Sequence, residues 1–267
     1  MQPVNLKFRL TSAEVRDSMS QKAKGPIIQS KLQVIRDFCL AHADPARVQK
    51  YARYFVEGYD AYGIEQKVYE AQRDCWIKEF ARDLDFDGFL ALGEALLKNG
   101  KYEEASFAIG FAAAFPEKYS SIVLERLGHW LDEGGFRNWA HTDVFCGMVL
   151  RQFFATKNTK LEEFSTWRES SSKWKRRAVP VGFIEALRAG YAIQPLLKFI
   201  VPLMMDQEKV VQQGLGWFLR EAWKREGAPV EKLLLQWKDR CPRLIVQYAT
   251  EKMAPKEKQK YRRKPKS

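Results

Sequence analysis

Trp139 and Asp143 stand four residues apart in a segment that is otherwise strongly apolar. At about 100° per residue, both side chains fall on one face of a helix. The rest of that helix, up to Phe154, is apolar on nearly every side, so we expect it to be enclosed. A carboxylate in such surroundings needs either a partner that satisfies it or a chemical role.

Two explanations of Asp143 fit the sequence. In the first, Asn138 caps the helix, Asp143 lies close to the positive end of the helix dipole, and a local hydrogen bond satisfies the carboxylate. In the second, the carboxylate is catalytic. A second tryptophan and a basic cluster, both later in the chain, bear on the choice.

Trp217 lies on a predicted helix over 207–226. Its side chain points about 130° away from the apolar stripe of that helix. Its neighbours on that polar face are Gln213, Arg220, Glu221 and Lys224. A tryptophan in this position either packs on a neighbouring helix or offers a surface on which a base or a sugar can stack.

The segment from Trp167 to Arg177 contains two tryptophans, and its last ten residues hold five basic side chains and one acid. Arginine grips phosphates bidentately and helix N-termini attract them, so this pattern favours a phosphate-binding site. The alternative is a solvated charged face. The basic residues that open the predicted helix at 173 are Lys173, Lys175, Arg176 and Arg177.

The sequence patterns predict that the elements which position these residues are all helices, and we find no convincing strand pattern. We expect a helix over Ser12–Lys24 that Gly25-Pro26 stops, a clearer one over 27–41, and one capped by Asp44-Pro45 that runs to about Gly58. The remaining predicted helices are 64–82, 86–99, 102–114, 117–132, 138–155, 159–171, 173–189, 193–205, 207–226, 229–239 and 242–253. Pairs of antiparallel helices recur at intervals of roughly 35 to 45 residues. This spacing favours a helical-repeat solenoid with a concave face over a compact bundle.

Composition places the chain among cytoplasmic globular proteins. Of its 267 residues 46% are hydrophobic, and no apolar run approaches the roughly 20 residues that span a bilayer. The N-terminus lacks the pattern of a signal peptide. The four widely spaced cysteines indicate reduced core thiols, without a disulfide framework or a metal knuckle.

The net charge of +12 points to a polyanionic partner. Eight of the Lys and Arg residues, against one acid, lie from Lys252 onward. We therefore divide the chain into a loosely ordered N-terminal extension (1–25), one helical-repeat domain (26–251) and a basic, disordered tail (252–267). A basic tail alone is weak support for DNA binding, whereas a folded basic site is stronger.

Taken together, four motifs resemble the bacterial DNA alkylation repair glycosylases built from HEAT-like helical repeats, the AlkD family. They occur in the family's order over about 45–225. These motifs are Ala52-Arg53-Tyr54 followed by Gly63-Ile64, the Trp139-x-x-x-Asp143 pair, the Trp167 to Arg177 segment, and Gly216-Trp217-Phe218-Leu219-Arg220-Glu221. The resemblance implies an all-α HEAT-like solenoid whose concave face binds DNA.

The resemblance also implies roles for individual residues. Asp143 would be the catalytic carboxylate, and Trp139 and Trp217 would flank the deoxyribose of the lesion. Tyr54 would line the cleft, and either Arg177 or Arg176 would contact the DNA backbone. From the basic pattern itself we also expect Lys173 and Lys175 to contact DNA. Ala140 departs from the family, in which we expect an acid next to the first tryptophan; that departure bears on local electrostatics and lesion preference.

The chemistry implied for the family suits these residue types. Breaking an N-glycosidic bond builds positive charge on the sugar, and an ionised carboxylate near C1′ stabilises that charge. A base that is already cationic, such as an N3- or N7-alkylated purine, leaves without a general acid. We therefore expect a monomeric glycosylase that releases 3-methyladenine or 7-methylguanine from double-stranded DNA, with no cofactor, no metal and no membrane.

Other readings make different predictions. His141 and Asp143 match the H-x-D pattern of an iron oxygenase. Side chains two residues apart on a helix point about 200° apart, however, so these two could not bind the same metal ion. A hydrolase triad lacks a Ser or Cys in an elbow-like turn. The serious rival is a non-catalytic helical-repeat protein that binds damaged or branched DNA, and it predicts binding without base release. Protein scaffolding would leave the clustered arginines and the exposed tryptophan unexplained.

Overall fold

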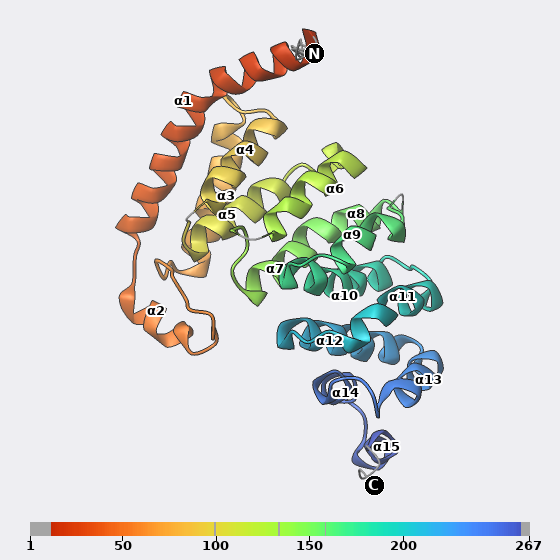
Figure 1. Ribbon diagram of the computed structural model, residues 1–267. Coiled ribbons are helices and arrows are strands. Elements are labelled where there is room, and N and C mark those ends of the chain that lie inside the picture. Colours follow the sequence, from red (N-terminus) through yellow and green to blue (C-terminus); the bar gives the residue numbers. More distant parts are fainter. Residues whose placement is uncertain (1–11, 99, 133, 158, 263–267) are drawn as a thin grey trace, which may run out of the picture.

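The computed structural model describes residues 12–98, 100–132, 134–157 and 159–262. Helices stack one after another along an arc from α1 to α15, and no strand occurs in these ranges (Figure 1). The prediction of an all-α helical-repeat fold is confirmed. The α-helices are α1 (Ser12–Ala41), α2 (Pro45–Ala52), α3 (Gln66–Phe80), α4 (Phe86–Leu97), α5 (Tyr102–Ala113), α6 (Ser121–Gly128), α7 (Trp139–Phe145), α8 (Arg151–Ala155), α9 (Ser165–Arg168), α10 (Lys173–Arg188), α11 (Ile193–Ile200), α12 (Lys209–Arg225), α13 (Gly227–Trp237), α14 (Arg243–Ala249) and α15 (Pro255–Lys258).

The prediction that Gly25-Pro26 ends a first helix is wrong, because α1 continues through Pro26 to Ala41. Contacts on both sides of the proline hold one helix. Lys24 pairs with Asp85 at the start of α4 at 2.7 Å, and Ile28 packs on the core. The proposed boundary between an N-terminal extension and the domain therefore falls inside a helix, while residues 1–11 lie outside the described residues.

Helix α2 begins where the sequence predicts and ends earlier. The carboxylate of Asp44 accepts the backbone N–H groups of Ala46 and Arg47, a standard N-cap. The helix ends at Ala52, and the chain then turns through Gly58, which has φ of +101°. As a result Tyr54 leaves the helix, and Val56 is 98% exposed.

The C-terminal half of the arc is built from helices that pack side by side, α10 on α12 and α12 on α14. Gly216 permits the second contact: a Cβ at this position would lie 2.5 Å from Cβ of Tyr248 and 2.8 Å from the carbonyl oxygen of Ile245. A side chain there would push α14 away from α12. The glycine of the Gly216-Trp217 motif thus brings Tyr248 next to Trp217.

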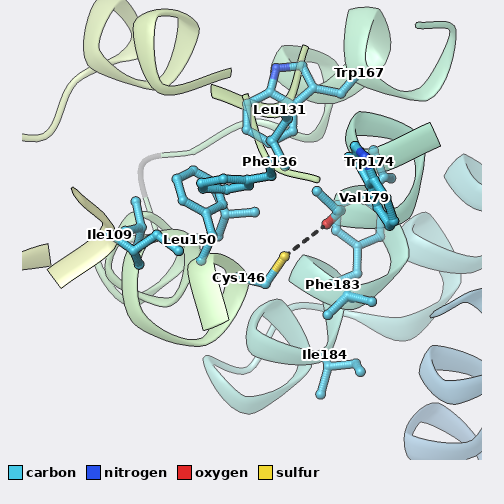
Figure 2. Packing of buried hydrophobic residues seen from close by; sticks show 14 of the residues in the cluster. Ile109, Leu131, Phe136, Cys146, Leu150, Trp167, Trp174, Val179, Phe183 and Ile184 are labelled. Atoms are coloured by element: carbon cyan, nitrogen blue, oxygen red, sulfur yellow. Dashed lines mark hydrogen bonds between the residues drawn. The ribbon is translucent and has the colours of Figure 1, made fainter. Parts of the chain in front are cut away.

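The predicted helix over 138–155 forms, but it contains a π-helical turn at Cys146–Leu150 between α7 and α8. Such a turn inserts an extra residue and often occurs at functional sites. The buried Cys146 thiol donates a hydrogen bond to the carbonyl oxygen of Ala178 in α10, at 3.6 Å (Figure 2). Around it Phe136, Trp167, Trp174 and Phe183 form a closed apolar core that joins α7 to α10.

The C-terminal segment packs on the domain, which corrects the prediction of a disordered tail from 252 for residues 252–262. Met253 and Tyr261 are buried, Lys260 pairs with Glu231 at 2.6 Å, and the carbonyl of Arg262 accepts a hydrogen bond from Lys238. The sequence pattern missed this because two apolar residues among many lysines have no helical period. Residues 263–267 lie outside the described residues.

Two further sequence expectations can be compared with the structure. Cys39, Cys146 and Cys241 are buried as expected, but Cys75 is exposed. Over the described ranges, no helix has the length and apolar character needed to cross a membrane.

Candidate active site

A cavity of about 460 Å³ brings together five residues that the sequence singled out, Tyr54, Trp139, Asp143, Arg177 and Trp217. They come from the turn after α2 and from α7, α10 and α12. Residues 163 positions apart, from Tyr54 to Trp217, thus line one space. Gln213, Arg220 and Tyr248 complete the lining. The volume lies in the range typical of small-molecule sites.

Trp139 is fixed on one face of the cavity by the turn after α2. Its indole Nε1 donates a hydrogen bond to the carbonyl oxygen of Tyr54 at 3.2 Å. Phe55, which is buried, stacks on the indole with ring centroids 5.7 Å apart and planes 16° from parallel. The ring position is therefore set before any ligand arrives.

The connection from α2 to α3 is held farther along, at residues 62–64, by a buried carboxylate of α5. Glu103 accepts hydrogen bonds from the backbone N–H groups of Tyr62, Gly63 and Ile64, at 2.8, 2.7 and 3.1 Å. Gly63 has φ of +83°, and a Cβ there would lie 2.4 Å from the carbonyl oxygen of Asp44. The Gly63-Ile64 motif is thus explained by a turn that only glycine fits.

Asp143 is satisfied by Arg177 of α10 rather than by a local hydrogen bond. Arg177 Nε donates to Oδ1 at 2.9 Å and Nη2 to Oδ2 at 2.8 Å, a bidentate pair. The Asp143 side chain is 16% exposed and that of Arg177 6%. Arg177 also donates to the carbonyl oxygen of Val210, and Gly214 leaves room for its stem, whose Cγ lies 3.2 Å from where a Cβ would be.

Burial and the arginine act on Asp143 in opposite directions. Desolvation raises the pKa of the carboxyl above its ordinary value, and the charge and hydrogen bonds of Arg177 lower it. Desolvation is the larger effect, so the pKa is raised overall. The ion pair geometry nevertheless requires a carboxylate that accepts on both oxygens. The result is a charged group held nearly dry at the edge of a cavity.

The start of α7 is fixed by a neutral histidine. Asn138 caps the helix as expected, with its side-chain oxygen accepting the N–H of His141. Burial lowers the pKa of His141 to about 4, so its ring is neutral. Nε2 donates to the carbonyl oxygen of Tyr102 at 2.9 Å, and Nδ1 then accepts from Asn138 at 3.0 Å. Both ring nitrogens are engaged, so His141 has a structural role.

The basic residues at the start of α10 are all paired within the protein. Lys173 lies 3.3 Å from Glu57, Lys175 2.7 Å from Asp132 and Arg176 2.6 Å from Asp206. Arg176 also donates to the carbonyl oxygens of Ser170 and Ser171. With Arg177 bound to Asp143, this cluster presents no unpaired cation among its described side chains. To contact a phosphate, each of these four residues would have to exchange its carboxylate partner for the phosphate.

Three lining residues were not singled out as site residues from the sequence. Gln213 and Arg220 flank Trp217 on its polar face, and that spacing was the available signal. Tyr248, from α14, gave no signal at all. Gln213 Nε2 donates to the hydroxyl oxygen of Tyr248 at 3.0 Å, and Arg220 pairs with Glu221 at 3.0 Å and with Glu251.

A second cavity of about 850 Å³ adjoins the first and shares Tyr54 and Trp139 with it. It lies between the α2 region and helices α3, α5 and α7. Five of the ten tyrosines of the chain line it, together with Phe55 and Trp139. Ala140, which departs from the family pattern, also lies on its wall. An acid at this position would have faced this aromatic space.

Neither cavity contains a cluster of metal ligands; among the described residues, no group of three or more His, Cys, Asp or Glu side chains could hold an ion.

Comparison with known proteins relates this architecture to one family. A search of curated proteins found no match. Among solved structures, a protein described as a predicted DNA alkylation repair enzyme from Enterococcus faecalis superimposes with a TM-score of 0.69 at 19% identity, over 80% of this chain and 98% of the other. At that identity the likeness shows the fold. The family model of the DNA alkylation repair enzymes matches residues 36–253, and the chain belongs to this family.

Proposed function

We propose that this protein is a DNA glycosylase that hydrolyses the N-glycosidic bond of positively charged alkylated purines in duplex DNA. The observation that carries the proposal is the Asp143 carboxylate, oriented by Arg177 at the wall of a cavity that two tryptophans also line. Membership of the DNA alkylation repair enzyme family supports a DNA substrate and a role in alkylation repair.

In the proposed reaction the deoxyribose of the lesion lies between Trp139 and Trp217. As the bond to the base lengthens, positive charge develops on the sugar. The Asp143 carboxylate stabilises that charge and orients the attacking water, and the indole faces favour it as well. Poor solvation strengthens these interactions, since the carboxylate is 16% exposed.

Arg177 acts in this scheme as a positioning residue. It keeps both carboxylate oxygens in one plane and favours the ionised form against the desolvation that raises the pKa of Asp143. The guanidinium is buried, so we propose that Arg177 serves the carboxylate and that other residues contact the phosphates.

The choice of positively charged bases as substrates follows from the carboxyl groups that line the cavity. Asp143 is the single carboxyl group on the described lining of this cavity, and it acts in the ionised form. In most glycoside hydrolases a second carboxyl group protonates the leaving group. A neutral base would therefore leave slowly, whereas 3-methyladenine and 7-methylguanine, cationic while attached, need no proton. The scheme uses no cofactor, and we propose a monomer that acts on DNA in the cytoplasm.

The test compares bases in otherwise identical duplexes. Purified protein in excess over DNA should release 3-methyladenine and 7-methylguanine and leave uracil and hypoxanthine in place. Efficient release of uracil would require an acid that this cavity lacks. Tight binding of methylated duplex with no release of any base would show a non-catalytic DNA-binding protein.

A further inference from the structure

Helix α2 stands apart from the stack of helices (Figure 1) and none of its residues is buried. Beyond it, Tyr54 is 52% and Val56 98% exposed, and within it Tyr51 is 38% exposed. Exposed apolar and aromatic side chains that cluster in one segment often mark an interaction site. We refer to residues 47–56 as the α2 arm.

The arm is basic. Its sequence, Arg47 to Val56, contains three cations and no acid, and Arg47 pairs with Asp44 just before the arm at 3.5 Å. Lys50 lies over the ring of Tyr51 at 5.5 Å, and Arg53 lies over Tyr54 at 4.9 Å and donates to its hydroxyl. Among the described side chains, no carboxylate pairs with either cation. They therefore differ from the cations at the start of α10, each of which has an acidic partner.

The arm is also directly coupled to the candidate active site. The carbonyl of Tyr54 holds the Trp139 indole, and the Tyr54 side chain lines both cavities. Glu57, next to the arm, lies 3.3 Å from Lys173, so the turn bridges to the start of α10. Three residues of the arm, Arg47, Tyr51 and Tyr54, also line the 850 Å³ cavity.

We propose that the α2 arm clamps the DNA backbone beside the lesion, with Lys50 and Arg53 on phosphates and with Tyr51, Tyr54 and Val56 against the sugars. The inference rests on the proposed function and adds the surface that holds the substrate. Phosphates match the two unpaired cations, and the apolar sides of deoxyriboses match the exposed rings and the valine. The clamp places the backbone next to the cavity that holds Asp143.

The decisive measurement is the salt dependence of binding to undamaged duplex. Each phosphate contact contributes about 0.9 to the slope of log K against log salt, so the double variant Lys50→Ala/Arg53→Ala should lower the slope by about 1.8. The matched control is Arg126→Ala/Arg188→Ala, which removes the same charge from two arginines paired with Glu94 and Glu185. Its slope should stay at the wild-type value.

Two results would overturn the clamp: an unchanged slope in the arm variant, or an equal fall in both variants, which would indicate a general effect of net charge. Because α2 buries no residue, the thermal midpoint of the arm variant should remain unchanged. The measurement uses no lesion, so it is independent of catalysis.

A position-specific probe tests the geometry. Val56→Cys in a Cys75→Ser background should form a disulfide, by thiol exchange, with a duplex that carries a mixed-disulfide tether on the phosphate beside an abasic-site analogue; the capping thiol of the tether is released. Ile122→Cys, at a 79% exposed site on α6, is the control. Crosslinking at 56 well above that at 122 supports the clamp, and equal crosslinking contradicts it.

Discussion

Replacing Arg177 by methionine should change both the stability and the pH dependence of the protein. The substitution keeps the length of the side-chain stem and removes two hydrogen bonds to Asp143, at 2.9 and 2.8 Å. It leaves a carboxylate that is 16% exposed without its partner. Breaking one side of a buried pair destabilises a protein by about 3–5 kcal/mol. In a chain of this size we expect a fall in Tm of roughly 6–20 °C at neutral pH.

The sign of the pH effect follows from the protonation of Asp143. Burial already raises the pKa of this carboxyl in the folded protein, and loss of Arg177 removes what lowers it. A carboxyl whose pKa is raised on folding stabilises the folded state at low pH and loses that contribution as pH rises through the folded pKa. The Tm deficit of the variant should therefore shrink on acidification.

The same shift should appear in the rate of base release. The ionised form of Asp143 is the active one, so the wild-type rate should rise with pH through the raised pKa of that group. In the Arg177→Met variant this inflection should move to higher pH, and the loss of rate should be greatest at the acidic end. Arg177→Lys, which retains the positive charge, should shift the inflection less.

The assay is single-turnover release of 7-methylguanine from duplex DNA over a series of pH values, with Tm measured in the same buffers. A methionine variant whose rate falls by the same factor at every pH, and whose Tm deficit is constant, would refute the role of Arg177 in setting the ionisation of Asp143.

Three other predictions use simpler comparisons. Trp217→Ala should reduce the release of 3-methyladenine more than it weakens binding to undamaged duplex, because the backbone contacts remain; equal losses would contradict stacking on the sugar. Deletion after Arg262 should flatten the salt slope of DNA binding and spare single-turnover release, and an unchanged slope would show that the last residues never meet the backbone. Deletion after Glu251 should in addition lower Tm, since it removes Tyr261 from the core, and an equal Tm for both truncations would argue against that packing.

Much of the fold could be predicted because it rests on local patterns. The helices over 86–97, 173–188 and 209–225 appear almost where periodicity and capping residues place them. The failures occurred where distant contacts override a local signal. Pro26 lies inside α1, and α1 packs on α4 through residues distant in sequence, such as Lys24 and Asp85, which no local rule contains.

In the candidate site, too, the local features could be predicted from the sequence and the contacts between distant residues could not. The sequence could place Trp139 and Asp143 on one face of a helix, and the structure puts both on one cavity with Trp217. Only the fold reveals that Arg177 pairs with Asp143 and that Arg176 pairs with Asp206. A cluster of cations in a sequence shows charge but not whether acids from elsewhere in the chain neutralise it.

The most direct test of the account is the Asp143→Asn variant with a duplex that contains one 7-methylguanine. Asparagine keeps the shape and still offers an oxygen to Arg177, but it removes the negative charge. With enzyme in excess, the wild type should release the base, and the variant should bind the duplex equally well and release the base about 10² to 10³ times more slowly. A variant that releases the base at the wild-type rate would contradict the assignment of Asp143 as the catalytic carboxylate.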